Sequence, residues 1–372
     1  MIESFEDSEK EKIYKEKFAK VFNQAVVPFY WSDLERNEGE LRFRKDSINI
    51  YRRPAPDIVL DFCNEYGIEP KGHCLVWNWF VPHWLQKYDI EQRKAILERR
   101  FKEISEEYAD KIPAFDIVNE SATNYYYGEK TLFPEYDEYG LDLGEKYFPN
   151  NEKILNETNG AIWESFLCGK YNPFEFQIKE LLSKNKCFDS IGIQYHMFAT
   201  EESFNDEGYL KKYLNPKIHF EILERLSSYG KSLHISEITI PSMFETSPEN
   251  EAIQAELLEK LYSLWFSIEN MKGIVWWNLI DGYAAFCARN SNEGENRHGG
   301  GLLHYDTSEK PAYRVLDELV NHRWKTNFEC ECTDSLSFRG FYGKYEIAVD
   351  VDGKTKTFDV DFSKNCSSAV FL

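Results

Sequence analysis

The chain has 372 residues, of which 42% are hydrophobic and 29% are charged, and its formal net charge is −20 at pH 7. Such a composition is typical of a globular protein. The negative charge argues against nucleic acid or an anionic membrane as partner, because phosphate binding requires a basic face. No apolar run is long enough to predict a membrane span, and the charged N-terminal sequence shows no signal peptide, which leaves the compartment open.

Eight cysteines are present, but no CxxC pair occurs, which argues against a zinc cluster. We expect most of these thiols to be buried in apolar surroundings. Aromatic residues make up 16% of the chain. Some of these rings could line a sugar-binding groove, because flat rings stack well on the C–H faces of sugars.

Short apolar runs typical of β-strands alternate with longer helical patterns along most of the chain. Strands are predicted at 24–31, 71–78, 114–120, 153–159, 190–196, 232–240 and 273–281. Helices are predicted near 54–66, 91–110, 160–184, 216–229, 249–270 and 311–322. This alternation predicts parallel strands joined by crossover helices.

Seven such units favour a (β/α)8 TIM barrel over an open sheet. A barrel of this kind has eight strands, and the residues before 24 have a helical pattern. We therefore expect the first strand to be missing from this chain; the alternative is a strand that the pattern does not reveal.

Two regions depart from the alternation of strand and helix. Residues 121–152 predict a long loop at the C-terminal end of a strand, where barrel enzymes build their sites. Residues 326–372 alternate with period two and contain an Asp352-Gly353 hairpin signal. We interpret 1–325 as a (β/α)8-type catalytic domain and 326–372 as an antiparallel β appendage of three or four strands. We expect the appendage to cover the barrel; the alternative is that it binds sugar.

Polar and aromatic side chains stand at or near the C-terminal ends of the predicted strands. In a barrel these ends converge on one mouth, whatever their separation in sequence. The residues are His73, Trp77, Asn119, Glu120, Gln194, His196, Glu237, Trp276 and Trp277.

Two carboxylates in an aromatic-lined mouth predict glycoside hydrolysis. One carboxyl group protonates the leaving oxygen, and the other attacks the anomeric carbon in retaining enzymes, where the two groups lie about 5 Å apart. Proximity of like charges raises one pKa of such a pair, which keeps the acid protonated. His196 could orient the nucleophile, and Asn119 could hold the sugar 2-hydroxyl. Taken singly, each glutamate is more typical of a solvated charge or a helix-cap neighbour, so the hypothesis depends on the set.

Six segments, in the same order, resemble glycoside hydrolase family 10, the retaining endo-β-1,4-xylanases. "GHCLVWN" is similar to GHTLVWH, "FDIVNES" to WDVVNEA, "LNETN" to NDYN, "IGIQYHM" to IGLQSHL, "LHISEIT" to IHITELD and "GIVWWNLID" to a VWGVTD segment. The resemblance covers roughly residues 20–322, and "GLLHYDTSEKPAY" is similar to the family's exit into its last helix.

The resemblance implies Glu120 as acid/base and Glu237 as nucleophile. It implies that the sugar next to the scissile bond is bound by His73, Trp77, Asn119, Gln194, His196 and Trp276. It also implies that no metal or cofactor is needed, that the partner is a β-linked polysaccharide or oligosaccharide, and that the family's usual location is extracellular.

The chain departs from the family's pattern at several positions. The family's TPENEMKW, whose charged residues hold the non-reducing side, is replaced by a segment with Tyr30 and Trp31, which we expect to contact substrate there. Asn78 replaces a histidine, and Ala285 or Phe286 stands near the position of a second tryptophan. The family's first strand is also not visible.

Three functions remain open at this stage. The first is endo-hydrolysis of xylan or xylo-oligosaccharides, and the second is the same machinery acting on another β-linked glycan or glycoside. The third is a glycan-binding barrel without turnover. The presence of both carboxylates argues against the third.

Overall fold

The computed structural model describes residues 2–122, 132–158, 168–204, 206, 215–331 and 336–363. The chain forms two compact units, Met1–Arg314 and Val315–Leu372. The division predicted between residues 325 and 326 stays a prediction about function, since a compact unit is not by itself a functional domain.

The first unit is built on one sheet of seven parallel strands that neighbour one another in chain order. The strands are β1 (Gln24–Pro28), β2 (Glu69–Val76), β3 (Ala114–Asn119), β4 (Glu152–Glu157), β5 (Ser190–His196), β6 (Ser232–Thr239) and β7 (Met271–Trp276). This order confirms the predicted (β/α)8 barrel type. The described residues supply seven strands, so β1 and β7 form the two edges of the sheet.

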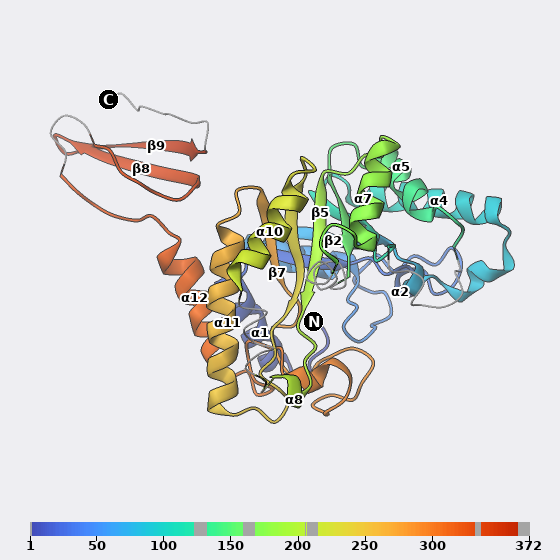
Figure 1. The fold of residues 1–372 in the computed structure, drawn as a ribbon, viewed down its shortest axis with the longest axis horizontal. Helices are drawn as coiled ribbons and strands as arrows, with labels where there is room; N and C mark the ends of the chain where they lie inside the picture. The colour runs from blue at the N-terminus through green and yellow to red at the C-terminus, as the bar shows by residue number, and fades with distance from the viewer. Residues whose placement is uncertain are drawn as a thin grey trace. The chain divides into compact units, whose positions relative to one another are not determined.

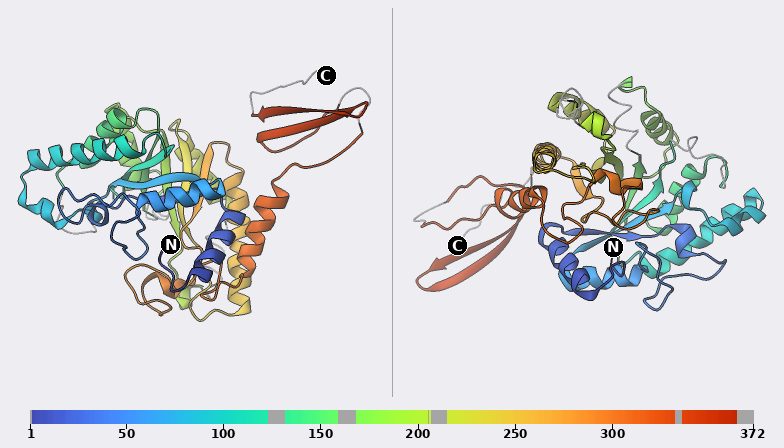
Figure 2. Two further views of the ribbon diagram at one scale, coloured as in Figure 1. Left: turned by 180° about the vertical axis from the view of Figure 1, so that it is seen from behind. Right: turned by 90° about the horizontal axis from the view of Figure 1, so that it is seen from below.

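Helix α1 precedes the first strand, further helices follow the strands, and the helices lie outside the sheet, which Figures 1 and 2 show from three directions. They are α1 (Ser8–Val21), α2 (Trp31–Leu34), α3 (Pro56–Tyr66), α4 (Ile90–Tyr108), α5 (Tyr136–Tyr147), α7 (Pro173–Ser183), α8 (Glu201–Phe204), α10 (Pro216–Ser227), α11 (Pro248–Phe266) and α12 (Pro311–Glu318). Short 3₁₀ turns occupy η1 (Asn78–Phe80), η2 (His83–Lys87) and η4 (Gly294–His298), and a π turn occupies η5 (Leu319–Arg323).

Helix α4 shows why the sequence patterns were informative. A capping box between Asp89 and Gln92 satisfies free N–H groups at its start. The spacing of Ile96, Leu97, Phe101 and Ile104 predicts one apolar face; the last three side chains are buried, and Ile96 is partly buried.

The predicted end of the first strand was wrong, and the predicted helix at 160–184 is described only in part. Strand β1 ends at Pro28 rather than at residue 31, because the backbone turns at Tyr30, whose carbonyl accepts hydrogen bonds from Asp33 and Leu34 at the start of α2. The helix predicted at 160–184 is α7, over Pro173–Ser183, and residues 159–167 lie outside the described part of the chain.

The N-terminal segment links the two edges of the sheet. Ser4 is buried, and its hydroxyl accepts a hydrogen bond from the Arg52 amide, which follows β1, at 2.8 Å. Its carbonyl accepts one from the Arg289 guanidinium, which follows β7, also at 2.8 Å. Residues 2–6 therefore tie together loops that leave the two edge strands.

The second unit contains an antiparallel hairpin of β8 (Gly343–Val351) and β9 (Lys354–Phe362). Asp352 and Gly353 both have positive φ, 52° and 75°, as a two-residue turn of the predicted type requires. The described residues of this unit contain these two strands, where three or four were predicted; residues 332–335 and 364–372 lie outside the description.

Arg100 gives a test of how α4 holds the strand ends. The side chain is 1% exposed, and it donates to the carbonyls of Leu75 (3.1 Å) and Phe29. Arg100→Met should lower the free energy of unfolding by about 2–4 kcal/mol, because two buried carbonyls lose their donor. Lys102→Met, an exposed change on the same helix, should cost under about 0.5 kcal/mol. Urea denaturation measures both, and equal losses in the two variants would contradict this role.

Candidate active site

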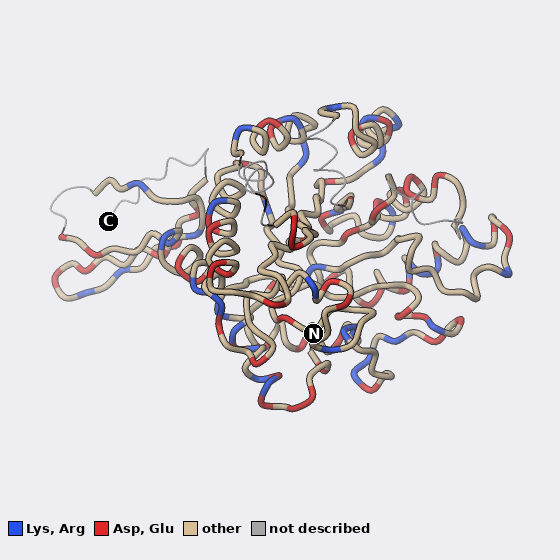
Figure 3. Tube along the Cα trace, turned by 60° about the horizontal axis from the view of Figure 1, so that its bottom comes forward, with Lys and Arg blue, Asp and Glu red and all other residues tan. Residues whose placement is uncertain are grey.

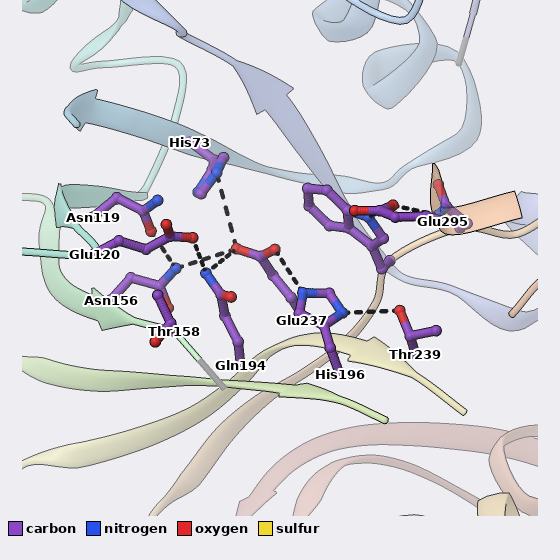
Figure 4. A network of polar contacts seen from close by, with 12 residues as sticks. His73, Asn119, Glu120, Asn156, Thr158, Gln194, His196, Glu237, Thr239 and Glu295 are labelled. Atoms are coloured by element: carbon purple, nitrogen blue, oxygen red, sulfur yellow. Dashed lines mark hydrogen bonds and ion pairs between the residues drawn. The ribbon is translucent and has the colours of Figure 1, made fainter. Parts of the chain in front are cut away.

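The carboxylate of Glu237, on β6, is the centre of a buried polar network at the mouth of the sheet (Figure 4). Its Oε1 accepts hydrogen bonds from Gln194 Nε2 (3.1 Å) and Asn156 Nδ2 (3.3 Å). Its Oε2 lies 3.3 Å from His196 Nε2, and His196 Nδ1 lies 2.8 Å from the Thr239 hydroxyl. Donors from β4 and β5 thus orient both oxygens, and hydrogen bonds to an ionised carboxylate are the stronger kind.

Glu120 follows β3 and faces the same network. Gln194 Nε2 donates to its Oε1 at 2.8 Å as well as to Glu237 Oε1 at 3.1 Å. One amide nitrogen therefore bridges the two carboxylates, and these oxygens are at most 5.9 Å apart (2.8 Å plus 3.1 Å). The backbone of Glu120 is left-handed, with φ of 52°, and its amide donates to the Asn156 carbonyl at 2.9 Å. Left-handed backbone at a non-glycine residue costs about 1–2 kcal/mol and is common at functional sites.

His73, on β2, is oriented by a buried ion pair in the barrel interior. Asp116 Oδ2 lies 2.8 Å from Lys71 Nζ and 2.7 Å from His73 Nδ1. Burial opposes ionisation of Asp116, but Lys71 and His73 lower its pKa to about 2. Because an ionised Asp116 can only accept, His73 Nδ1 carries a proton, and His73 Nε2 lies 3.9 Å from Glu237 Oε1.

Aromatic rings extend from His73 along the mouth. Tyr30 is buried, and its ring meets the His73 ring edge-on at 5.4 Å and the Trp77 ring at 5.9 Å. Burial raises the pKa of Tyr30, and the Arg53 guanidinium, 4.1 Å above its ring, opposes that rise. Tyr30 therefore packs against rings beside the polar network, and its contact with substrate stays a prediction.

The two adjacent tryptophans at the end of β7 face opposite ways, as successive residues of a strand do. The ring of Trp276 packs against Tyr262 of α11 at 6.2 Å, and its Nε1 donates to backbone carbonyls. Trp277 instead lies edge-on to His196 at 5.6 Å, and its Nε1 donates to Glu295 at 2.8 Å. The structure thus brings Trp277 to the polar network, while the predicted Trp276 faces the helix layer.

Other positions where the chain departs from the family also have definite surroundings. Trp31 is buried and donates to Glu35 at 2.9 Å, and among the described contacts none joins it to either candidate carboxylate. Asn78 accepts from the Leu132 amide at 3.1 Å. Phe286 is 85% exposed, with positive φ.

Several residues of the network were not predicted from sequence. Asn156, Thr239, Asp116 and Glu295 belong to this group. Asn156 pairs in register with Asn119 and donates to its Oδ1 at 2.7 Å. Aligning the two strands by register would have revealed this pair, whereas Glu295 lies in the short 3₁₀ turn η4, which is too short to show a periodic pattern.

No cluster of three or more metal-ligating side chains occurs within the described ranges. In the same residues, no helix is long and apolar enough to cross a membrane. Six cysteines lie in the described part of the chain, all of them free thiols, and Cys332 and Cys366 lie outside it.

These strands and carboxylates are those of a glycoside hydrolase barrel. The chain belongs to glycosyl hydrolase family 10, whose profile matches residues 3–318. It is 24% identical over 336 residues to "Anti-sigma-I factor RsgI6" of Acetivibrio thermocellus, and the match covers 88% of this chain and 39% of that protein. It is 23% identical over 361 residues to "Endo-1,4-beta-xylanase 1" of Arabidopsis thaliana, covering 92% of this chain and 33% of that one.

The fold is also similar to solved structures. Xylanase 10B from Thermotoga petrophila RKU-1, in complex with xylobiose, aligns with a TM-score of 0.66 at 21% identity, covering 86% of this chain and 91% of that one. Native xylanase 10B from Thermotoga maritima aligns with a TM-score of 0.65 at 22% identity, covering 86% and 93%. At this identity the likeness supports the shared fold. The chain spans well under half the length of these two curated relatives.

Asp116 provides a test of the ion pair behind His73. Asp116→Asn should lower the free energy of unfolding at pH 7 by about 3–5 kcal/mol, because Lys71 would keep a buried charge without its partner. The ordinary pKa of aspartate, about 3.9, lies above the folded value of about 2. The stability that depends on the charge is therefore present above about pH 4 and is lost as pH falls toward 2.

Denaturant unfolding of the wild type and of Asp116→Asn between pH 7 and pH 2 measures this difference, which should shrink in the acid range. The control is Asp142→Asn, because Asp142 is 52% exposed and pairs with Lys186 on the surface at 2.7 Å. That change should cost about 0–1 kcal/mol. A pH-independent difference between wild type and Asp116→Asn would show that the charge of Asp116 is not the cause.

Proposed function

We propose that this chain is a retaining glycoside hydrolase that cleaves internal β-1,4-xylosidic bonds of xylan or xylo-oligosaccharides. The observation that carries this proposal is the Gln194 amide, which donates to both Glu120 and Glu237 and holds the bonded oxygens within 5.9 Å (2.8 Å plus 3.1 Å). Retaining enzymes have carboxyl groups about 5–5.5 Å apart, and an amide nitrogen that bridges the two carboxylates supports a short separation of this kind. Family membership and the xylanase names among the relatives support the choice of xylan.

In the first step, a Glu237 oxygen forms a bond to the anomeric carbon while the bond to the leaving oxygen breaks. Glu120 gives its proton to that oxygen, so the leaving sugar departs as an alcohol and a glycosyl ester remains on Glu237. In the second step, Glu120, now ionised, takes a proton from water, and the water oxygen displaces Glu237 from the anomeric carbon. Two inversions give net retention.

The surroundings of the carboxylates support the binding of a sugar between them. Asn119 accepts from Asn156 through Oδ1, and its buried Nδ2 has no acceptor among the described residues. The buried Nε1 of Trp77 likewise has none. Buried donors without partners are costly, and sugar hydroxyls at these positions would satisfy them.

Another β-linked glycan, or binding without turnover, is the second candidate. One relative is named an anti-sigma factor rather than a hydrolase, and this name supports glycan binding without turnover as the alternative. Release of reducing ends from xylan, mixed-linkage glucan and aryl xylosides distinguishes these functions. The binding alternative predicts affinity without any product.

Substitution of the two glutamates tests their roles. Glu237→Ala should lower kcat on xylan by roughly 10⁴-fold or more, since the nucleophile is lost. Glu120→Ala should lower it by about 10²–10⁴-fold. With a dinitrophenyl xyloside, whose leaving group needs no proton, Glu120→Ala should lose much less in the first step and accumulate the glycosyl-enzyme.

Glu245→Ala, an exposed glutamate in the loop after β6, is the matched control and should retain wild-type turnover. Proton NMR of the first product formed should show the β-anomer. An initial α-anomer, or full turnover by Glu237→Ala, would overturn the retaining mechanism.

A further inference from the structure

A cavity of about 120 Å³ lies beside the polar network, at the β1 side of the mouth. Apolar residues of β1, α1 and α3 form most of its wall. Tyr30, Arg52, Arg53 and Trp277 also line it, so two adjacent cations face one cavity. The position of these residues beside the candidate nucleophile raises the question of what the cations bind.

Tyr30 and Trp277 connect the cavity to Glu237 from two directions. Tyr30 packs on His73, and Trp277 packs on His196, whose Nε2 lies 3.3 Å from Glu237. Figure 4 shows Glu237 between Glu120 on one side and Glu295, the partner of Trp277, on the other. Neither candidate carboxylate lines the cavity, which adjoins residues that pack on the Glu237 side of the network.

Arg52 carries a charge that the protein does not neutralise by direct contact. Its Nη2 donates to Asn278 Oδ1 at 2.5 Å, and its buried Nε has no acceptor among the described residues. No described carboxylate lies within ion-pairing distance of Arg52, and the link to Glu295 runs through the Asn278 amide. Burial lowers the pKa of the Arg52 guanidinium, in keeping with a cation that lacks a direct partner.

Arg53 adds a second cation that is only partly compensated. Its side chain is 11% exposed, stacks on Tyr30 at 4.1 Å and lies 3.5 Å from Asp33. A cation removed from water without an acidic partner costs several kcal/mol, so the retention of Arg52 beside a reaction centre points to a ligand. The planar guanidinium, with its fork of N–H donors, matches a carboxylate.

We propose that Arg52, with Arg53, binds the carboxylate of a uronic acid side group of the substrate, so that acid-decorated xylan is preferred. This inference rests on the proposed function for its substrate class. The net charge of −20 does not oppose it, because acidic and basic positions are interspersed along the chain (Figure 3) and charges beyond about 8–10 Å are screened in physiological salt. The charges near the cavity, rather than the net charge, therefore determine the potential there.

The test compares two ligands that differ at one carbon. One is a xylo-oligosaccharide with a glucuronic acid side group, and the other is the same oligosaccharide after reduction of the carboxyl group to a primary alcohol. Calorimetry with Glu237→Gln, which should not cleave either ligand, measures both affinities. The acidic ligand should bind at least about 10-fold more tightly, as expected for one charge-assisted hydrogen bond.

In the same background, Arg52→Gln should bring the ratio of the two affinities to within about threefold of one. Arg52→Lys, which keeps the charge but not the fork, should give an intermediate ratio. Arg36→Gln, at an exposed arginine, is the matched control and should keep the wild-type ratio. Binding of an undecorated oligosaccharide by Arg52→Gln shows that this variant is folded. If Arg52→Gln does not bind that ligand, the affinity ratio measured with Arg52→Lys tests the carboxylate site instead.

Equal affinity for the two ligands, or an unchanged ratio in Arg52→Gln, would overturn the carboxylate site. Wild-type turnover of neutral xylan under the same conditions would show that the proposed function survives that failure. Conversely, selective and Arg52-dependent binding without any turnover would support the carboxylate site while rejecting hydrolysis.

Discussion

The arrangement of the mouth depends on the hydrogen bonds that converge on the carboxylate of Glu237. Their donors come from β4 and β5, and they meet only because the parallel strands pair in the register observed. Gln194 lies directly opposite Glu237 in that register. A slip by one residue would turn every side chain of a strand to its other face. Strand register is therefore the constraint that places an amide between the two candidate carboxylates.

The strands and both carboxylates could be predicted because polar residues are conspicuous in apolar strands. Glu120 follows the buried run of β3, Gln194 lies near the end of the buried run of β5, and both belong to the network. The sequence alone does not show which of Trp276 and Trp277 faces the mouth, because successive side chains of a strand point to opposite faces. The ring contacts of the two residues settle this. Asn156 was missed for a related reason: its importance depends on pairing with Asn119, a contact between strands that neither sequence segment reveals alone.

The loops were the least predictable part of the site. Arg52 and Glu295 lie in segments without a regular repeat, so hydrophobic periodicity gives no information on where their side chains point. They are nevertheless held in place, because the Arg52 amide donates to Ser4 and its guanidinium donates to Asn278. The contacts that link the two edges of the sheet thus also position a cation beside the mouth, and a single segment serves the fold and the site.

An arginine without a direct carboxylate partner is a poor solution for stability alone. An acidic residue beside Arg52 would lower the cost of its burial, but it would also compete with a ligand for the guanidinium of a residue that lines the cavity. In the structure, Asp33 neutralises Arg53 in part, whereas the guanidinium of Arg52 donates to the neutral side-chain amide of Asn278. Natural proteins accept such local costs mainly where a ligand repays them. Since Glu237 must meet a sugar a few side chains away, the ligand most consistent with this geometry is a negatively charged group carried by that same sugar chain.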